Sequence, residues 1–500
     1  MTLFRARQDG NFWQLPLWLG GGALAAIVFW LTPGGATILL WMNLLLLVGV
    51  STCQLYAANL SEAHPKKRQL KGQPFVSIHI PIYNEPPEIV QEALSCLAGL
   101  EYDNFEVIVL DNNTKDEAVW RPVEAFCAHL GKRFRFRHVD NLKGFKAGAL
   151  NVTLGMTHPE AEYILVLDAD YCVDTCLLHT ALKYFTDDRT ALVQFPQAYS
   201  NSVGHNAGLT DEYAHFFSVY MNMANHLGSV LSTGTVSVLK VAALRDIGGW
   251  SSESITEDVE VSLQLLGAGY RGVYVSKPLG KGLMPVTAAD LKKQRQRWVF
   301  GNAQTLLHFF KMDKSRLNWR QRFGVFTQLT AWFNFTLLPL TILPLATVFY
   351  ALSGREAHLN TLQLALFTLW LNLTVKLAFF VLARRRGEGA GPALTAFGTH
   401  LGLLWQGSSS WLKCLLGVRL GFERTNKFLG GARRRTGGWA PSLLALGCAL
   451  LLFRSGARIE AALSLAALAL PAGSLILTNQ LNATRRATRP IYRRLEEKWR

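Results

Sequence analysis

The stretch that decides the fold is Tyr163-Ile164-Leu165-Val166-Leu167-Asp168-Ala169-Asp170, an apolar run that ends in two aspartates. A short apolar run of this kind is typical of a buried β-strand. Three further segments before it, residues 74–81, 105–110 and 134–139, also read as strands, and helical periodicity lies between them, most clearly at 88–100. Alternating strands and helices predict an α/β domain with a mostly parallel sheet and helices on both faces.

The apolar residues of the 500-residue chain are concentrated in two regions. Residues 15–57 and 323–479 are rich in Leu, Ala, Phe and Trp, whereas residues 60–320 read as a soluble domain. A chain of this length exceeds one ordinary domain. We predict four regions: a transmembrane hairpin at 1–60, a cytoplasmic α/β domain with interfacial helices at 61–320, a second membrane region at 321–480 and a basic cytoplasmic tail at 481–500.

Six segments approach the length and composition of transmembrane helices. Such a helix needs about 20 mostly apolar residues. The segments form three successive pairs, at 15–31 and 36–57, at 323–352 and 362–383, and at 439–453 and 459–477. The α/β domain would therefore be inserted in a helical membrane domain of about six spans.

Residues 393–416 are also apolar, but Gln406, three serines and Lys413 interrupt them. Arginine clusters at 384–386 and 433–435 flank this segment, and Arg-rich loops stay on the cytoplasmic side of a membrane. A single crossing between the clusters would place one of them outside. We therefore predict an interfacial or re-entrant amphipathic helix, with the soluble domain and both termini in the cytoplasm.

The formal net charge of +16 does not indicate nucleic-acid binding, because the basic residues cluster beside the hydrophobic segments. Examples are residues 66–68 and 485–500, and this is the positive-inside pattern of a protein of the cytoplasmic membrane. Basic loops there favour anionic headgroups, so membrane lipids are the predicted partners. The seven cysteines are scattered and complete no zinc-type set, which indicates reduced thiols.

Aspartates end two of the predicted strands. Asp111 follows the strand at 105–110, and Asp168 and Asp170 follow the strand at 163–167. Ligands of α/β sheets bind beyond the carboxyl ends of the strands. Carboxylates spaced as Asp-x-Asp suit Mg²⁺ or Mn²⁺ held together with substrate phosphates. Taken singly, each acid is also typical of a turn or a helix cap.

Thr256-Glu257-Asp258 opens a helical segment at 259–266. One explanation is that acids in the first turn are favoured by the helix dipole. The other is a general base that takes a proton from a sugar hydroxyl. A helix N-terminus tends to keep a carboxylate ionised, as a base requires at neutral pH.

Gln294-x-x-Arg297-Trp298 lies on a predicted helix rich in Lys and Arg. One interpretation is a solvated basic face with a single buried Trp. The other gives Arg297 to a diphosphate and Trp298 to sugar stacking. Lys146, in a glycine-containing stretch at 144–151, could also reach a nucleotide, because glycines permit close backbone approach.

The order and spacing of these motifs closely resemble the membrane-embedded processive glycosyltransferases of family 2, the group of cellulose, hyaluronan and chitin synthases and related β-glucan synthases. The resemblance covers residues 74–304. It implies a GT-A fold, a UDP-sugar donor bound with Mg²⁺ or Mn²⁺, and inversion of the anomeric centre.

The resemblance also implies a role for each motif residue. Asp258 would be the catalytic base and Asp170 the metal ligand. The nucleotide-sugar would contact Asp111, Lys146, Asp168, Gln294 and Arg297, and the acceptor would contact Trp298, Thr233 and Glu257.

A second resemblance lies in Phe422-Glu423-Arg424-Thr425-Asn426-Lys427, within residues 418–437. This stretch is similar to the cytoplasmic gating loop of cellulose synthases, which reads Phe-x-Val-Thr-x-Lys. By that resemblance Thr425 and Lys427 would contact bound UDP. The alternative is an ordinary basic loop beside the membrane.

The chain departs from the family pattern at three positions. Asn112 stands where many relatives have a second Asp, Ser232-Thr233-Gly234-Thr235 replaces Phe-Cys-Gly-Ser, and Arg424 replaces the gating-loop Val. The changes near the acceptor make another β-glucan, or another polysaccharide, as plausible as cellulose.

We therefore expect an inverting, processive hexosyltransferase that polymerises a UDP-sugar, with UDP-glucose the leading donor, into a β-linked polysaccharide and moves it across the inner membrane, with accessory secretion proteins as possible partners. One alternative is a non-processive glycosyltransferase with a lipid acceptor. Another is a synthase of an N-acetylglucosamine- or mannose-containing glycan. A third, of a different class, is a transporter or scaffold with an inactive nucleotide-binding domain.

Overall fold

The computed structural model describes residues 33–383, 390–418, 420, 440–465 and 469–499. The chain divides into two compact units. Unit 1 comprises Met1–Ser51, Asn334–Lys376 and Gly437–Ala472, and unit 2 comprises Thr52–Phe333, Leu377–Thr436 and Gly473–Arg500. The predicted span at 15–31 and the predicted UDP contacts Thr425 and Lys427 lie outside the described residues.

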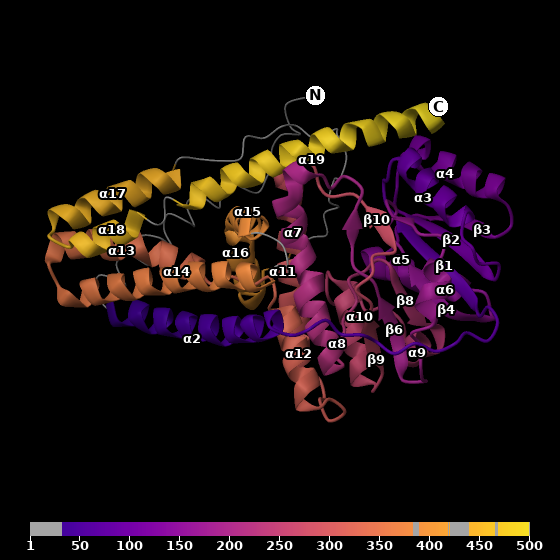
Figure 1. Cartoon of the computed structure of the whole chain (residues 1–500), viewed down its shortest axis with the longest axis horizontal. Coiled ribbons are helices and arrows are strands. Elements are labelled where there is room, and N and C mark those ends of the chain that lie inside the picture. Colours follow the sequence, from indigo (N-terminus) through magenta and orange to yellow (C-terminus); the bar gives the residue numbers. More distant parts are fainter. Residues whose placement is uncertain (1–32, 384–389, 419, 421–439, 466–468, 500) are drawn as a thin grey trace. The chain divides into compact units, whose positions relative to one another are not determined.

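A seven-stranded sheet forms the centre of unit 2 (Figure 1). Its strands are β1 (Phe75–Ile82), β2 (Phe105–Asn112), β3 (Phe134–Val139), β4 (Ala161–Val166), β6 (Thr190–Gln194), β8 (Ser237–Lys240) and β9 (Arg271–Tyr274). They lie in the order β3-β2-β1-β4-β8-β6-β9. Only β8 is antiparallel to its neighbours, so the prediction of a mostly parallel sheet is confirmed.

Helices cover both faces of this sheet, as predicted. Successive side chains of a strand point to opposite faces, and in β4 Tyr163 and Leu165 enter one apolar cluster while Ile164 and Val166 enter another. The first cluster includes residues of α3 (Pro87–Ala98), α4 (Glu117–Leu130) and α6 (Leu177–Leu182). The second includes residues of α5 (Phe145–Met156), α9 (Val241–Asp246) and α10 (Glu257–Gly267).

A second sheet of three very short strands lies beside the Asp-x-Asp segment. It consists of β5 (Cys172–Val173), β10 (Gly280–Gly282) and β7 (Ala198–Tyr199), in that order. Because β5 also lies against α3, Cys172 and Cys96 come within 5.5 Å at their Cα atoms and form a disulfide. The prediction of reduced thiols is therefore wrong for this pair, whose proximity is a tertiary contact that sequence spacing does not reveal.

Further helices extend unit 2 away from the sheet. They are the 3₁₀ turn Gly204–Asn206, α7 (Ala207–His215), the π-helical turn Phe216–Met221, α8 (Asn222–Leu227), α11 (Ala288–Lys311) and α12 (Trp319–Leu329). The Thr287 hydroxyl caps α11 by accepting from the N–H of Asp290. This fixes the start of the helix that carries Gln294, Arg297 and Trp298.

The segment predicted at 393–416 forms two helices, α15 (Ala390–Leu401) and α16 (Leu404–Leu415), with Gly402 and Leu403 between them. Each has 12 residues. At 1.5 Å per residue each is about 18 Å long, which is shorter than the roughly 30 Å hydrocarbon core of a bilayer. The two helices pack on α7 and α11 respectively, so the expectation of a non-spanning segment agrees with their length.

The last described helix, α19 (Ala469–Trp499), contributes Gly473–Arg500 to unit 2. Thr484 and Thr488 of this helix accept hydrogen bonds from the amides of Asn206 and Asn201 at 2.8 and 3.0 Å. Leu495 packs with Ile89 of α3. The stretch predicted as a basic tail is therefore helical and docked on the α/β domain.

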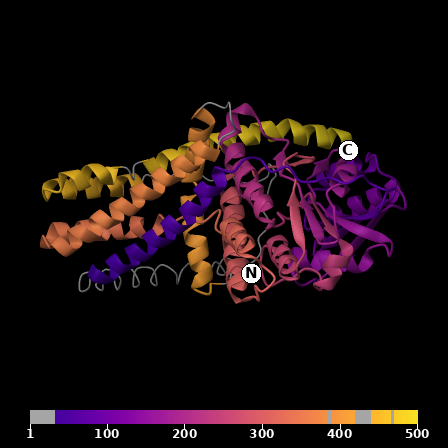
Figure 2. The ribbon, with the colours of Figure 1, turned by 60° about the horizontal axis from the view of Figure 1, so that its bottom comes forward.

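Unit 1 is helical (Figures 1 and 2). Its described parts come from α2 (Pro33–Ala58), α13 (Leu337–Ser353), α14 (Glu356–Ala383), α17 (Ala440–Arg454), α18 (Arg458–Ser464) and the first residues of α19. Five of these helices share one apolar cluster, to which they contribute Leu40, Ile342, Leu362, Leu452 and Ala461. The helices of unit 1 therefore pack around a common core.

Two helices of the described residues are long and apolar enough to cross a membrane, Gly34–Ala58 and Glu356–Ala383. They match two of the six predicted spans. The predicted span 323–352 is interrupted, because the Asn334 side chain accepts from the N–H of Thr336 and from the amide of Asn372, and α12 and α13 are separate helices. The predicted span 459–477 falls on α18 and α19, and residues 466–468 between them are not among those described.

Candidate active site

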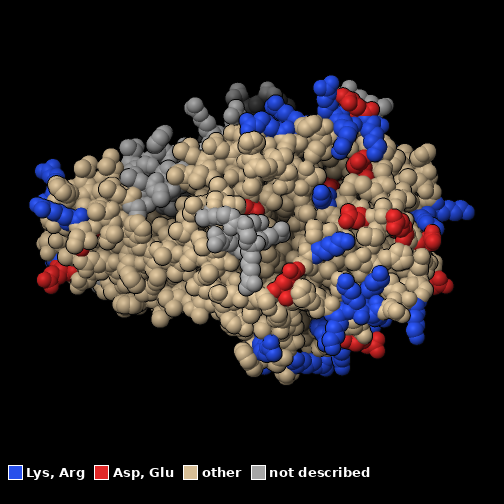
Figure 3. All heavy atoms as spheres, viewed as in Figure 1, with Lys and Arg blue, Asp and Glu red and all other residues tan. Residues whose placement is uncertain are grey.

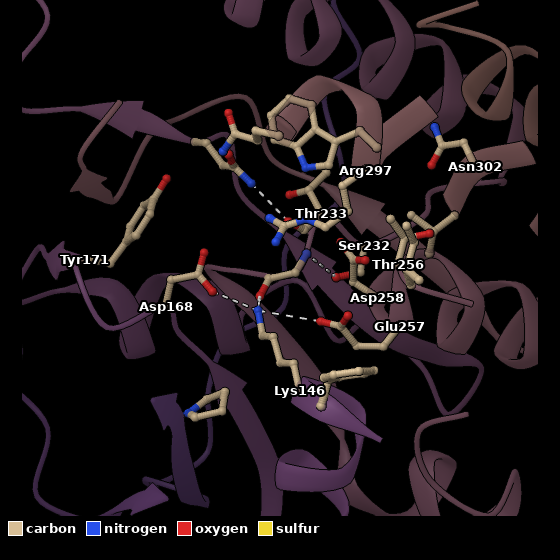
Figure 4. Close-up of a pocket in the computed structure, with 18 of the residues that line it drawn as sticks. Lys146, Asp168, Tyr171, Ser232, Thr233, Thr256, Glu257, Asp258, Arg297 and Asn302 are labelled. Atoms are coloured by element: carbon tan, nitrogen blue, oxygen red, sulfur yellow. Dashed lines mark hydrogen bonds and ion pairs between the residues drawn. The ribbon is translucent and has the colours of Figure 1, made fainter. Parts of the chain in front are cut away.

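A cavity of about 340 Å³ opens at the carboxyl ends of the strands of unit 2. The loops after β1, β2 and β4, the loop before β8, the first turn of α10 and one face of α11 form its wall. Open α/β sheets bind their ligands at this edge. Nine residues predicted from the sequence line the cavity: Lys146, Asp168, Asp170, Thr233, Glu257, Asp258, Gln294, Arg297 and Trp298. Figure 4 labels six of them, Lys146, Asp168, Thr233, Glu257, Asp258 and Arg297.

Lys146 lies between two acids of the cavity (Figure 4). Its Nζ is 2.7 Å from Oδ1 of Asp168 and 3.7 Å from Oε1 of Glu257. Nζ also donates to the carbonyl oxygen of Gly234 at 2.9 Å. Burial alone would lower the pKa of Lys146, but the charges of Asp168 and Glu257 outweigh burial and raise it. Lys146 is therefore a fixed positive charge among the acids.

Asp258 follows Glu257 in the first turn of α10. Burial and the charge of Glu257 raise the pKa of Asp258 to about 7, against the opposing charge of Lys146. The expectation that the helix N-terminus keeps this carboxylate ionised is wrong, because the backbone N–H groups have the weaker effect. A pKa near the working pH suits a general base.

Asp170 is anchored to β10, because its Oδ2 accepts from the N–H of Leu283 at 2.7 Å. Among the described residues, no group of three or more His, Cys, Asp or Glu side chains could hold a metal ion. Mg²⁺ commonly binds one or two carboxylates and completes its shell with substrate phosphates and water. Asp168 and Asp170 fit that donor set, and metal binding at Asp170 stays a prediction.

Gln294, Arg297 and Trp298 share one face of α11, since they are spaced i, i+3 and i+4. Gln294 accepts a hydrogen bond from the hydroxyl of Tyr213, and the Trp298 ring meets Tyr213 edge-on at 5.6 Å. Burial lowers the pKa of Arg297, whereas the charges of the neighbouring acids act in the other direction. This basic side chain therefore lies within the field of the acidic cluster.

The close approach of α11 to α10 depends on Gly301. A Cβ atom there would lie 2.4 Å from Oγ1 of Thr256, so any larger residue would push the helices apart. Thr256 directly precedes Glu257 and Asp258. Gly301 therefore allows Asp258, the expected base, to lie close to Arg297 and Trp298 on α11.

Sequence reasoning missed a buried ion pair behind this motif. Both terminal nitrogens of Arg295 donate to the carboxylate of Glu212, at 2.7 and 2.6 Å, and both side chains are at most 2% exposed. The Arg295 guanidinium also lies 3.8 Å from the centre of the Trp332 ring. The interpretation of this helix as a solvated basic face is therefore wrong at Arg295. Glu212 lies 83 residues away, and no local signal marks it.

Two buried hydroxyl groups of the cavity wall, those of Tyr171 and Thr233, have no hydrogen-bond partner among the described residues. The backbone of Thr233 is held, since its N–H donates to Gln194 and its carbonyl accepts from Gln197. Buried hydroxyls normally have partners. These two therefore mark positions where a ligand can complete the hydrogen bonding.

Asp111 is placed differently from the other predicted residues. It is 1% exposed and does not line the cavity, because its carboxylate accepts from the Thr114 hydroxyl at 2.6 Å and lies 2.7 Å from Nδ1 of His138. Asn112 and Asn113, directly after it, do line the cavity. A nucleotide contact by Asp111 stays a prediction.

Two protein-family models match the chain. Residues 77–248 match the model described as Glycosyl transferase family 2, and residues 163–382 match the model described as Glycosyl transferase family group 2. Because the two models together cover residues 77–382, the chain belongs to glycosyltransferase family 2, which confirms the predicted family. The mixed sheet with helices on both faces fits the GT-A fold expected of that family.

Within the family, the chain is cellulose synthase-like. It is 26% identical over 240 residues to the UDP-forming cellulose synthase catalytic subunit of Xanthomonas axonopodis pv. citri, covering 46% of this chain and 32% of that one. It is 29% identical to Glucomannan 4-beta-mannosyltransferase 1 of Cyamopsis tetragonoloba, covering 51% and 50%. It is 30% identical to the Poly-beta-1,6-N-acetyl-D-glucosamine synthase of Staphylococcus epidermidis, covering 49% and 57%. The chain thus spans between a third and just over half of these relatives.

Proposed function

We propose that the chain is an inverting, processive hexosyltransferase that builds a β-linked polysaccharide from a UDP-sugar, with UDP-glucose as the first donor to test. The observation that carries the proposal is one cavity in which Asp258, with a pKa of about 7, lies with the Asp168–Asp170 pair and Arg297. Such a transfer needs a general base, carboxylates that can bind a metal ion together with the diphosphate, and a cation that neutralises the leaving group.

In the proposed reaction, Asp258 accepts the proton of an acceptor hydroxyl as that oxygen attacks C1 of the donor sugar. The bond between C1 and the diphosphate oxygen breaks on the opposite side, so an α-linked donor gives a β-linked product. Arg297 and Lys146 hold the leaving diphosphate by charge. A divalent ion bound at Asp168 and Asp170 would add further neutralisation of that diphosphate.

The acceptor is proposed to lie on the α11 side of the cavity. Trp298 offers a ring for a sugar to stack on, and the Thr233 hydroxyl has no partner among the described residues. Glu257, bound to Lys146, would orient the acceptor hydroxyl beside Asp258. The growing end of the glycan would therefore meet the base directly.

We further propose that the protein lies in the cytoplasmic membrane with the catalytic domain inside. The support is the pair of apolar helices and their outward-facing side chains, such as Leu45, which is 70% exposed, and Phe367, which is 56% exposed. On the face seen in Figure 3, the described part of unit 1 shows few charged side chains except at its outer end. Exposed apolar helix surfaces of this extent are typical of membrane interaction.

The relatives' names cover glucose, mannose and N-acetylglucosamine polymers. They favour a polymer product over a single sugar on a lipid, and they leave the sugar to experiment. The test is to give the purified full chain UDP-glucose or UDP-N-acetylglucosamine with Mg²⁺ or Mn²⁺. UDP release is then measured, and the product is digested with linkage-specific glycanases.

Asp258→Asn is expected to abolish transfer, because an amide cannot take the proton. The matched control is Asp246→Asn on α9, which changes a carboxylate outside the cavity that accepts from Tyr270. Full transfer by a folded Asp258→Asn variant would refute the assigned base. Products of one or two sugars would refute processivity alone and favour the lipid-acceptor alternative.

A further inference from the structure

Tyr171 directly follows Asp170 in the loop between β4 and β5. Its side chain lines the cavity and is 2% exposed. Its hydroxyl has no hydrogen-bond partner among the described residues. None of the roles assigned above uses this group, although it adjoins Asp170, the expected metal ligand, in the sequence.

The Tyr171 ring lies directly against the backbone of Gly282. A Cβ atom on Gly282 of β10 would lie 2.3 Å from Cε2 of the ring and 2.9 Å from Oδ2 of Asp170. Glycine at position 282 therefore allows the Tyr171 ring and the Asp170 carboxylate to lie this close to the strand. Since Asp170 is also bonded to the N–H of Leu283, Asp170 and Tyr171 form one unit fixed on β10.

Two other tyrosines of the cavity wall use their hydroxyls within the protein. Tyr199 donates to Oε1 of Gln197 at 3.0 Å, and Tyr213 donates to Gln294. Tyr171 differs from both, because its buried hydroxyl meets no protein acceptor in the described part of the chain. Leaving a buried hydroxyl unpaired is unfavourable, and a bound ligand that accepts its hydrogen bond would remove this cost.

We infer that the Tyr171 hydroxyl donates a hydrogen bond to the diphosphate of the nucleotide-sugar donor. This inference rests on the proposed function. A phenol needs an acceptor, and phosphate oxygens are strong acceptors. A divalent ion held at Asp168 and Asp170 would bring the diphosphate next to the adjoining Tyr171. The acceptor glycan is assigned to other residues of the cavity, Trp298 and Thr233. Tyr171 is thus a donor-binding residue.

The test compares Tyr171→Phe with Tyr102→Phe. Tyr102 is equally buried but lies outside the cavity, and its hydroxyl donates to the carbonyl of Pro74. With the full chain in detergent, UDP binding in Mg²⁺ is measured by calorimetry and thermal unfolding by fluorescence. Tyr171→Phe is expected to weaken UDP binding about tenfold, as for loss of a hydrogen bond to a charged group, and to leave Tm unchanged or higher. Tyr102→Phe is expected to keep UDP binding and to lower Tm.

The outcomes separate this inference from the proposed function. UDP binding by Tyr171→Phe within twofold of wild type overturns the inference. The inference is also overturned if Tyr171→Phe keeps UDP binding but raises the KM for an added oligosaccharide acceptor, because the hydroxyl then binds the acceptor. A fall in Tm as large as that of Tyr102→Phe, with no loss of UDP binding, assigns Tyr171 a purely structural role and overturns it. Failure of the wild-type chain to bind UDP would instead refute the proposed function.

Discussion

Replacing Arg295 by methionine is expected to destabilise unit 2 strongly, whereas replacing Arg295 and Glu212 together is not. The two side chains are bonded through both nitrogens and both oxygens and are at most 2% exposed. Removing one partner of a buried pair leaves an uncompensated charge, but replacing both by apolar residues often restores stability. Comparing the single with the double variant therefore isolates the free-energy cost of leaving the buried Glu212 carboxylate without a partner.

The size of the effect follows from the pKa of Glu212. Burial alone would raise it, but Arg295, with His400, lowers it from 4.5 to about 2. The pair therefore stabilises the folded state by an amount on the order of a few kcal/mol. Because the pKa in the folded state is lowered, this contribution is present above pH 4.5 and is lost as the pH falls towards 2. At neutral pH, Arg295→Met should therefore cost about 3–5 kcal/mol.

Thermal unfolding of the full chain in one detergent provides the assay. At about 2–4 °C per kcal/mol, Arg295→Met should lower Tm by at least about 6 °C, and Glu212→Leu with Arg295→Met should recover most of this loss. Arg121→Met is the matched control, because Arg121 forms a 2.7 Å pair with Glu117 in which both partners are exposed. That change should cost less than about 1 kcal/mol. Equal stability of the single and double Arg295 variants would refute the reasoning.

Three further predictions concern the cavity. Transfer (kcat/KM) should rise with pH and reach half its maximum near pH 7, because Asp258 must be ionised to accept a proton; a flat profile down to pH 5 would contradict this. Glu257→Gln should move that rise to lower pH, since it removes a charge that raises the pKa of Asp258, and an unchanged midpoint would exclude the coupling. Gly282→Ala should weaken UDP binding measured by calorimetry, because its Cβ would displace the Tyr171 ring; binding equal to wild type would show that the ring can move without consequence.

The first four strands were predictable, because β1, β2 and β4 are short and mostly buried and β3 alternates aromatic and charged residues. The runs at 74–81, 105–110, 134–139 and 163–167 correspond to β1–β4 to within two residues at either end. The second sheet could not be predicted, because β5 and β7 have two residues each and β10 has three. Strands this short carry no periodic pattern.

The cavity residues were predictable because motifs at strand ends and at the start of a helix converge on one edge of the sheet. Tyr171 was missed because its importance comes from Gly282, a distant residue, and Arg295 because its partner Glu212 lies on another helix. The predicted span at 323–352 failed for a similar reason. Hydropathy over these residues does not register that Asn334, between α12 and α13, accepts hydrogen bonds from the N–H of Thr336 and from the side-chain amide of Asn372.

The docking of α19 has a consequence for the order in which the protein is made. The ribosome synthesises unit 2 through α11 and α12, then α13 to α17, and only afterwards the helix that bonds Asn201 and Asn206 and covers Ile89. At about 5–20 residues per second, the stretch from Lys311 to Ala469 takes roughly 10–30 s. During this interval Ile89 and the side-chain amides of Asn201 and Asn206 lack the contacts that α19 supplies, so this surface of unit 2 is completed only after the helices α13 to α18 have been made.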